Sequence, residues 1–177
     1  VAQTVQRQAD DIVKVSQGRS VSKNSSSTEV QLQGNANSLA DDASDYVPLF
    51  GWTCKRGDGL SKERYQKQER IFSACGGAAL YRRSILDEIG YFEEAFFAYG
   101  EDVDLGWRGN IHGYKNIFNP KAIVYHICSA TTGGRYNAFK AIKSGQNTAL
   151  LLWKNQPLLQ LIINMPFILI GFLPKYL

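Results

Sequence analysis

Residues 96–108 have the sequence Phe96-Phe97-Ala98-Tyr99-Gly100-Glu101-Asp102-Val103-Asp104-Leu105-Gly106-Trp107-Arg108, and this stretch decides how the chain folds. Apolar residues recur at Val103, Trp107 and Ile111, a spacing that predicts one face of an amphipathic helix. Gly113 follows at the position where a left-handed glycine commonly ends a helix. We therefore predict a helix that starts directly after Gly100 and stops before Gly113.

The start of this predicted helix is acidic. Glu101, Asp102 and Asp104 bring three carboxylates within four residues. The macrodipole and the unpaired N–H groups of a first helical turn favour ionised carboxylates there. Aromatic residues crowd the approach, namely Tyr91, Phe92, Phe96, Phe97 and Tyr99. Two interpretations stay open: a functional site beneath an aromatic loop, and the acidic first turn of an ordinary helix.

Two further segments flank the acidic helix. Residues 74–83, Ala-Cys-Gly-Gly-Ala-Ala-Leu-Tyr-Arg-Arg, are rich in small side chains. Gly76 and Gly77 either allow a ligand to approach the backbone closely or form a plain turn between two strands. Residues 119–126, Asn-Pro-Lys-Ala-Ile-Val-Tyr-His, predict a turn and then a strand that ends at His126. On the residues alone, a lone histidine after a strand is more often structural than a ligand.

The remaining pattern predicts alternating strands and helices, which is typical of a layered α/β domain. Strands are expected over 71–75, 78–81, 116–118 and 122–126. Ser84 and Asp87 resemble a capping box for a short helix that Gly90 closes. A long helix is expected over 136–155 and is ended by Pro157, with Phe139, Ile142, Ala149, Leu150 and Trp153 at its apolar positions.

In this order, the segments resemble the second half of an inverting family 2 glycosyltransferase of the GT-A type. The rhamnosyltransferase-like members that build bacterial surface polysaccharides are the most similar. The resemblance covers residues 45–157 and depends above all on the string Glu-Asp-Val-Asp-Leu-x-Trp-Arg within the ordered set. It implies that this chain holds the acceptor-side half of a Rossmann-like GT-A domain, followed by an apolar C-terminal helix.

The resemblance also implies a chemistry: transfer of a sugar, with inversion, from a nucleotide-sugar donor to a glycan or lipid-linked acceptor. A carboxylate must take the proton of the attacking acceptor hydroxyl. The resemblance places this general base at Asp102, and Glu101 is the competing carboxylate in the sequence. Acceptor contacts are expected along Gly76 and Gly77.

Three residues of the acidic helix have two possible roles each. Asp104 points about 200° around the helix from Asp102, so it either orients the loop or contacts acceptor hydroxyls. Trp107 belongs either to the core or to an acceptor platform. Arg108 forms either an ion pair with a nearby acid, which we favour, or a contact with a phosphate. All three are candidate acceptor-binding residues.

A divalent cation is expected as cofactor, because the departing diphosphate needs a Lewis acid to offset its charge. Similar enzymes hold Mn²⁺ or Mg²⁺ with an Asp-x-Asp at the end of an early strand and with a late histidine, which His126 matches. The sequence has no match to that early strand, so most metal ligands and the donor-binding half are expected to be missing. The isolated chain is therefore expected to be inactive.

Composition divides the chain into three parts. Residues 1–44 are polar and predict a poorly structured segment. Residues 45–156 form the predicted catalytic half-domain. Residues 157–177 are apolar and flanked by Lys154, Lys175 and Tyr176. This pattern favours a helix at the membrane interface or the start of a spanning segment, and a buried core helix is the alternative.

Charge and cysteine content narrow the function further. The net charge of +4 is too small to indicate nucleic-acid binding. Three cysteines without a Cys-x-x-Cys favour reduced thiols in the cytoplasm. Together with the apolar tail, the resemblance to enzymes of bacterial surface polysaccharide synthesis implies the cytoplasmic face of the bacterial inner membrane. Two other hypotheses stay open. One is a catalytically inactive fragment or membrane-surface interaction module. The other is a metal-dependent hydrolase, which would need Glu101, Asp102, Asp104 and His126 to converge.

Overall fold

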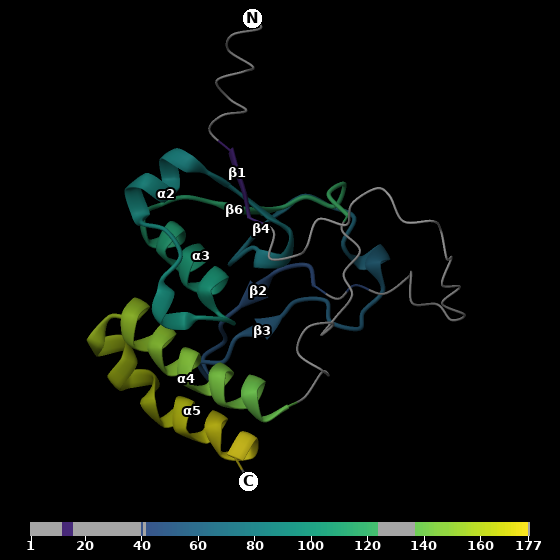
Figure 1. Ribbon diagram of the computed structural model, residues 1–177. Helices are drawn as coiled ribbons and strands as arrows, with labels where there is room; N and C mark the ends of the chain where they lie inside the picture. The colour runs from purple at the N-terminus through teal and green to yellow at the C-terminus, as the bar shows by residue number, and fades with distance from the viewer. Residues whose placement is uncertain (1–11, 16–39, 41, 124–136, 177) are drawn as a thin grey trace, which may run out of the picture.

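The computed structural model describes residues 12–15, 40, 42–123 and 137–176 (Figure 1). The helices and strands of these residues are, in order, β1 Ile12–Val15, β2 Asp45–Tyr46, β3 Cys54–Lys55, η2 Lys62–Arg64, β4 Glu69–Ile71, η3 Gly76–Ala78, β5 Ala79–Arg82, α2 Arg83–Ile89, η4 Glu94–Phe96, α3 Glu101–Ile111, β6 Asn116–Phe118, α4 Ala138–Asn155 and α5 Leu158–Tyr176. The chain is thus a mixed α and β structure, as the sequence predicts.

Among the described residues, the strands form three separate antiparallel pairs: β1 with β5, β2 with β3, and β4 with β6. An isolated bridge between Asp45 and Ser73 joins β2 to the segment that follows β4. The expected α/β class is met in the broad sense that helices and small sheets are mixed. The pairs contain no parallel ladder, so the Rossmann-like GT-A sheet stays a prediction.

Helix α3 lies where the sequence predicts it. It begins at Glu101, directly after Gly100, and Gly113 follows its end with a φ of +84°. The predicted apolar face is shorter than expected, because Val103 is buried whereas Ile111 is 61% exposed. Gly106 lets the helix approach the chain before η3, since a Cβ at this position would lie 2.9 Å from the Ser73 Cα.

Helix α2 ends at Gly90 as predicted, with a φ of +86° at the glycine, but its start is different. The N-cap is Arg82, so the predicted capping box at Ser84 is wrong. Asp87 instead accepts a hydrogen bond from the Tyr91 hydroxyl at 2.6 Å and lies 3.7 Å from the Arg83 guanidinium. The Asp87 carboxylate thus pairs with side chains and does not accept a capping hydrogen bond at the start of α2.

Helix α4 starts after Asn137, whose side chain accepts a hydrogen bond from the Lys140 N–H at 2.8 Å, and it ends before Pro157 as predicted. Its buried face is not the predicted one, because Phe139, Ile142 and Trp153 are exposed. The buried residues are Gly145, Asn147, Thr148, Leu151, Leu152 and Asn155. This face is partly polar because it supplies hydrogen bonds to α3 and to the loop before it.

The core lies where α3, α4 and the loop before α3 meet. Phe96, Val103 and Leu151 are its fully buried members. The ring of Trp107 packs against this core and edge-on against Phe72, with 5.4 Å between the ring centroids. Helix α5 folds back beside α4 (Figure 1). None of the helices in the described residues is long and apolar enough to cross a membrane.

Candidate active site

Asp102 is the second residue of α3, and its half-buried carboxylate is held by two backbone N–H groups. Oδ2 accepts a hydrogen bond from the Gly76 N–H at 2.7 Å, and Oδ1 accepts one from the Val103 N–H at 2.8 Å. The Ser73 hydroxyl donates to the main-chain carbonyl of Asp102 at 2.8 Å. The carboxylate therefore has a fixed position, and each of its oxygens keeps a lone pair for a further partner.

Gly76 lies against this carboxylate, whereas Gly77 does not. A Cβ at Gly76 would lie 3.2 Å from Asp102 Oδ2, and a Cβ at Gly77 would meet only the sulfur of Cys75, at 3.8 Å. The small residue at Gly76 thus serves the approach of the backbone to Asp102. Gly77 is exposed at the surface beside it.

Burial raises the pKa of Asp102 above its ordinary value, and the hydrogen bonds from Gly76 and Val103 act in the opposite direction. The sequence predicts that the helix start alone keeps this group ionised. In the structure, burial also disfavours the ionised form of Asp102. A carboxylate with a raised pKa is a stronger proton acceptor once it is ionised, which suits a general base.

The loop before α3 is held in a strained conformation. Phe97 and Tyr99 have φ values of +59° and +71°, in the left-handed region that is unfavourable for such side chains. The buried amide of Asn147 on α4 donates to the carbonyls of Phe96, Ala98 and Tyr99 at 2.8, 2.6 and 2.7 Å. The side chain of Asn147 thereby fixes the backbone of residues 96–99, the loop that leads into α3.

The aromatic residues of this loop divide into core and surface. Phe96 is fully buried, whereas Phe97 is 76% exposed. Tyr99 is partly exposed, and its ring lies 6.5 Å from the ring of Phe139 on α4. The exposed rings of Phe97 and Tyr99 give the outer side of the loop an aromatic surface, as the sequence suggests.

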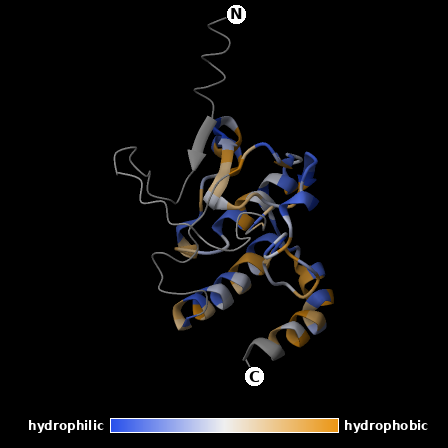
Figure 2. Cartoon of the chain, turned by 90° about the vertical axis from the view of Figure 1, so that its right-hand side faces the viewer, coloured by the Kyte–Doolittle hydropathy of each residue, from blue (hydrophilic) through white to orange (hydrophobic). Residues whose placement is uncertain are grey.

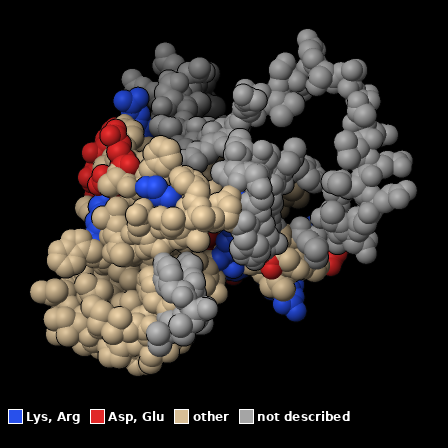
Figure 3. Space-filling view, turned by 60° about the horizontal axis from the view of Figure 1, so that its bottom comes forward, with Lys and Arg blue, Asp and Glu red and all other residues tan. Residues whose placement is uncertain are grey.

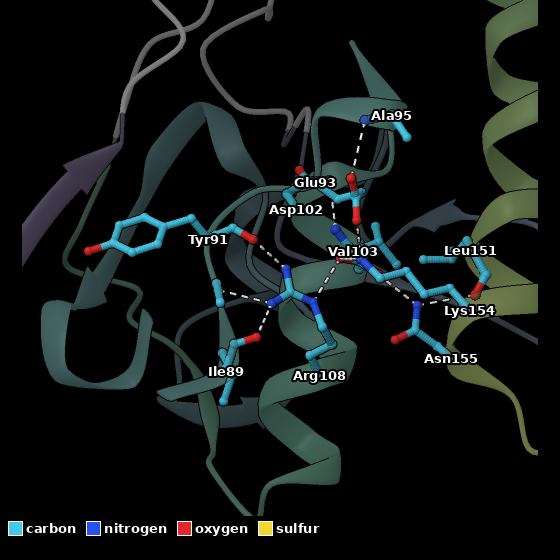
Figure 4. Close-up of polar contacts among 12 residues, drawn as sticks. Ile89, Tyr91, Glu93, Ala95, Asp102, Val103, Arg108, Leu151, Lys154 and Asn155 are labelled. Carbon is cyan, nitrogen blue, oxygen red and sulfur yellow. Dashed lines mark hydrogen bonds and ion pairs between the residues drawn. The ribbon is translucent and has the colours of Figure 1, made fainter. Parts of the chain in front are cut away.

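Asp104 lies on the other side of α3 and is fully buried. Its oxygens accept hydrogen bonds from Arg108 Nε at 2.9 Å, Asn155 Nδ2 at 2.8 Å and Lys154 Nζ at 3.1 Å. Figure 4 shows Lys154 and Asn155 approaching from α4. Asp104 therefore has no exposed surface in this structure, and its contacts run to α4 and to Arg108.

Arg108 completes this structural network. Besides Asp104, its guanidinium donates to the carbonyls of Ile89, Gly90 and Tyr91, with distances of 2.9 Å to Gly90 and 2.7 Å to Tyr91 (Figure 4). The predicted ion pair is thus present, and the contacts leave the guanidinium engaged with protein atoms. The candidate acceptor contacts at Arg108 and at the core residue Trp107 receive no support from this geometry.

The structure brings some predicted site residues together and separates others. Gly76 contacts the Asp102 carboxylate, and Glu101 precedes Asp102 in the first turn of α3. Asp104 and Arg108 instead face α4 and the end of α2. The hydrolase hypothesis required the side chains of Asp102 and Asp104 to converge on one metal ion. The Asp102 carboxylate contacts Gly76 and that of Asp104 contacts α4, so this arrangement does not support the hypothesis. His126 lies outside the described residues, so its predicted role as metal ligand stays a prediction.

Three further residues form a cluster that the sequence did not single out. Oxygens of Asp42 and Asp45 and the sulfur of Cys75 all lie within 4.8 Å of one another. Burial, and then the neighbouring Asp42 and Asp102 carboxylates, raise the pKa of Asp45 to about 8. Burial likewise raises the pKa of the Cys75 thiol to about 12. The cluster adjoins Asp102, because Gly76 directly follows Cys75.

The pKa of Asp45 predicts a pH-dependent stability. The unfolded carboxyl titrates near its ordinary value of 3.8 and the folded one at about 8, so between these values only the folded state holds the proton. The contribution of Asp45 to the free energy of unfolding is therefore fully present below about pH 4 and is lost as pH rises towards 8. Asp45→Asn removes this pH-dependent contribution, so the variant should be more stable than the wild type at pH 8 by about 1–3 kcal/mol.

Urea unfolding at pH 5 and pH 8, with a chelator present, measures this effect. The difference in free energy of unfolding between wild type and Asp45→Asn should be large at pH 8 and small at pH 5. An equal gap at both pH values would contradict the assignment to Asp45. A wild type that is more stable than Asp45→Asn at pH 8 would show that the ionised carboxylate has a stabilising partner.

Comparison with known proteins gives partial matches. The sequence is 38% identical over 89 residues to two proteins named N-acetylglucosaminyl-diphospho-decaprenol L-rhamnosyltransferase, from the CDC 1551 / Oshkosh and ATCC 25618 / H37Rv strains of Mycobacterium tuberculosis. The match covers 50% of this chain and 28% of the length of each relative. No family model and no solved structure matches. These matches support a glycosyltransferase-like family.

Proposed function

We propose that this chain carries the acceptor side and the general base of an inverting glycosyltransferase of the GT-A type. The observation that carries the proposal is the geometry of Asp102, a half-buried carboxylate fixed by Gly76 and Val103 at the start of α3. The partial match to two rhamnosyltransferases supports the same class of reaction.

In this reaction Asp102 accepts the proton of the attacking acceptor hydroxyl. Inversion requires a single in-line displacement at the anomeric carbon, so the base and the leaving diphosphate lie on opposite sides of the sugar. The hydrogen bonds from Gly76 and Val103 hold the carboxylate in place without saturating its oxygens. The loop fixed by Asn147 shapes the entrance with the exposed rings of Phe97 and Tyr99.

The substrates proposed are a nucleotide-sugar donor and a glycan acceptor linked to a lipid diphosphate. The names of the relatives include such a lipid, decaprenol, and a rhamnosyl group. A divalent metal, Mn²⁺ or Mg²⁺, would supply Lewis-acid assistance to the leaving diphosphate, with His126 as one proposed ligand. The proposed process is polysaccharide synthesis at the cytoplasmic face of a bacterial inner membrane.

The experiment is a transfer assay with the protein expressed together with any flanking sequence that its gene supplies. Radiolabelled nucleotide sugars are tested with a synthetic acetylglucosaminyl-diphospho-lipid, and the anomeric configuration of the product is read by NMR. An inverted glycosidic product supports the proposal. Absence of transfer from every donor would favour the alternative, an inactive or interacting module.

A membrane-facing surface on α5 belongs to the same proposal. One side of α5 packs on the domain, where Asn164 and Ile168 are buried and the ring of Phe172 lies 5.5 Å from that of Trp52. The opposite side is apolar and exposed, at Leu158, Leu159, Ile162, Ile163, Leu169 and Ile170. Figure 2 shows that α5 consists mostly of hydrophobic residues, and Figure 3 shows a broad surface without charged residues at this end of the molecule. Such a helix suits the plane of a membrane interface, close to a lipid-linked acceptor.

Replacing Leu159, Ile162 and Ile163 together by serine should abolish binding to anionic phospholipid vesicles, because these side chains are 71%, 59% and 56% exposed. The fold should persist, since the substitutions remove exposed apolar area. The control is Leu80→Ser with Ile111→Ser, at apolar positions 65% and 61% exposed on β5 and α3. Vesicle co-sedimentation measures the result, and equal loss in both variants would contradict a surface specific to α5.

A further inference from the structure

The cluster of Asp42, Asp45 and Cys75 is a set of buried donor atoms outside the machinery described above. The Asp42 side chain is 7% exposed, as is Asp45, and Cys75 is half-buried. Donor atoms around a tetrahedral Zn²⁺ lie roughly 3.3–3.8 Å apart, given metal–ligand distances of about 2.0–2.3 Å. The observed separations, all within 4.8 Å, need a contraction of only about 1 Å to reach this geometry.

Asp45 provides a second observation that points to a ligand. Its backbone is held by mutual hydrogen bonds with Ser73, of 3.1 and 3.2 Å, and an oxygen of its carboxylate lies within 4.8 Å of the other two donor atoms. Within the described part of the chain, no group donates a hydrogen bond to this carboxylate at short range, although Asp45 is more than nine-tenths buried; the Lys55 ammonium attracts its charge without forming a close ion pair. Burying an acid without a partner is unfavourable, and a cation would supply the missing partner.

The surroundings of the cluster fit a cation as well. Asp42 already accepts a hydrogen bond from the Ser44 N–H at 2.8 Å, and the Lys55 ammonium lies 3.9 Å from its other oxygen. The hydroxyl of Tyr81 is buried nearby and finds no hydrogen-bond partner among the described residues. The two carboxylates and the thiol thus face a single neighbouring ammonium group, so a divalent cation would balance the remaining negative charge.

We propose that Asp42, Asp45 and Cys75 bind one divalent transition-metal ion with the preferences of Zn²⁺. One sulfur and two oxygen donors suit a borderline-soft metal such as Zn²⁺ or Co²⁺ better than Mg²⁺, which prefers oxygen alone. The Cys75 thiol loses its proton to solvent as the metal–sulfur bond forms, so the ligand is the thiolate. The site uses none of the ligands that the family resemblance implies for the catalytic cation.

The test is a titration of the full 177-residue chain with Co²⁺, followed by competition with Zn²⁺. A cobalt–thiolate bond gives a near-ultraviolet charge-transfer band, and tetrahedral Co²⁺ gives intense visible bands. We expect both at one equivalent of metal, and we expect Zn²⁺ to displace them. Absence of the charge-transfer band, or its appearance only with a large excess of Co²⁺, would overturn the proposal.

Matched variants identify the ligands. Cys75→Ser should remove the charge-transfer band, and Asp45→Asn should weaken Zn²⁺ binding at least tenfold by calorimetry. Cys54→Ser, at a half-buried thiol on β3, and Cys128→Ser should leave both readouts unchanged. Circular dichroism without metal checks that each variant folds. A band that persists in Cys75→Ser would reject the site, and neither readout involves sugar transfer, so the two proposals fail separately.

Discussion

Replacing Asp102 by asparagine is expected to lower sugar transfer by about 10²-fold or more, because the variant has no group to accept the acceptor proton. The asparagine oxygen can still accept the hydrogen bond from the Gly76 N–H, which is 2.7 Å long in the wild type. Volume and position are conserved as well. Burial disfavours the charge at this position, but the asparagine NH2 takes the place of the oxygen that accepts the Val103 N–H, so the free energy of unfolding should fall slightly, by about 1 kcal/mol, at neutral pH.

Glu101→Gln is the matched control for this prediction. Glu101 precedes Asp102 in the first turn of α3 and is the other carboxylate of the pair. Single-turnover rates with saturating donor, together with urea unfolding of each protein, separate loss of chemistry from loss of fold. If Glu101→Gln abolished transfer and Asp102→Asn kept it, the base would be Glu101. If both kept it, the proposed role of this turn would be wrong.

Local patterns in the sequence account for the elements that surround Asp102. Gly90 and Gly113 both follow helix ends with positive φ, where backbone conformation alone favours glycine. The start of α3 after Gly100 is also a local property of the chain. The contact between Gly76 and Asp102 spans 26 residues, and the sequence left open whether Gly76 allows a ligand to approach the backbone or forms a plain turn.

The remaining features depend on partners that are distant in the sequence. Periodicity favours the apolar residues of α4 as its buried face, but Asn147 and Asn155 are buried because carbonyls of the 96–99 loop and Asp104 accept their hydrogen bonds. The available signal was that Asn147 and Asn155 lie four residues before and after Leu151, which places all three on one face of the helix. The cluster of Asp42, Asp45 and Cys75 forms only because the Asp45–Ser73 bridge aligns two separate segments.

Replacing Asp104 by alanine is expected to reduce the free energy of unfolding by about 3–5 kcal/mol, the range for removing one partner of a buried ion pair. Its carboxylate is fully buried and accepts hydrogen bonds from Arg108, Lys154 and Asn155. Without it, the Asn155 amide and the Arg108 Nε face a cavity. Because a domain of this size is stable by only about 5–15 kcal/mol, the loss is a large fraction of the total.

Glu93→Ala provides the control, because Glu93 binds the same Lys154 ammonium at the same distance, 3.1 Å, as Asp104 does. The Glu93 side chain is 41% exposed, so water replaces the lost partner and the change in stability should be close to the error of measurement. The midpoints of urea unfolding of the variants and the wild type are compared, and they report stability as long as the m-value does not change. Asp104→Asn should fall between the two, since it keeps volume and one acceptor but not the charge. Equal losses for Asp104→Ala and Glu93→Ala would show that burial does not govern the contribution of this network to stability.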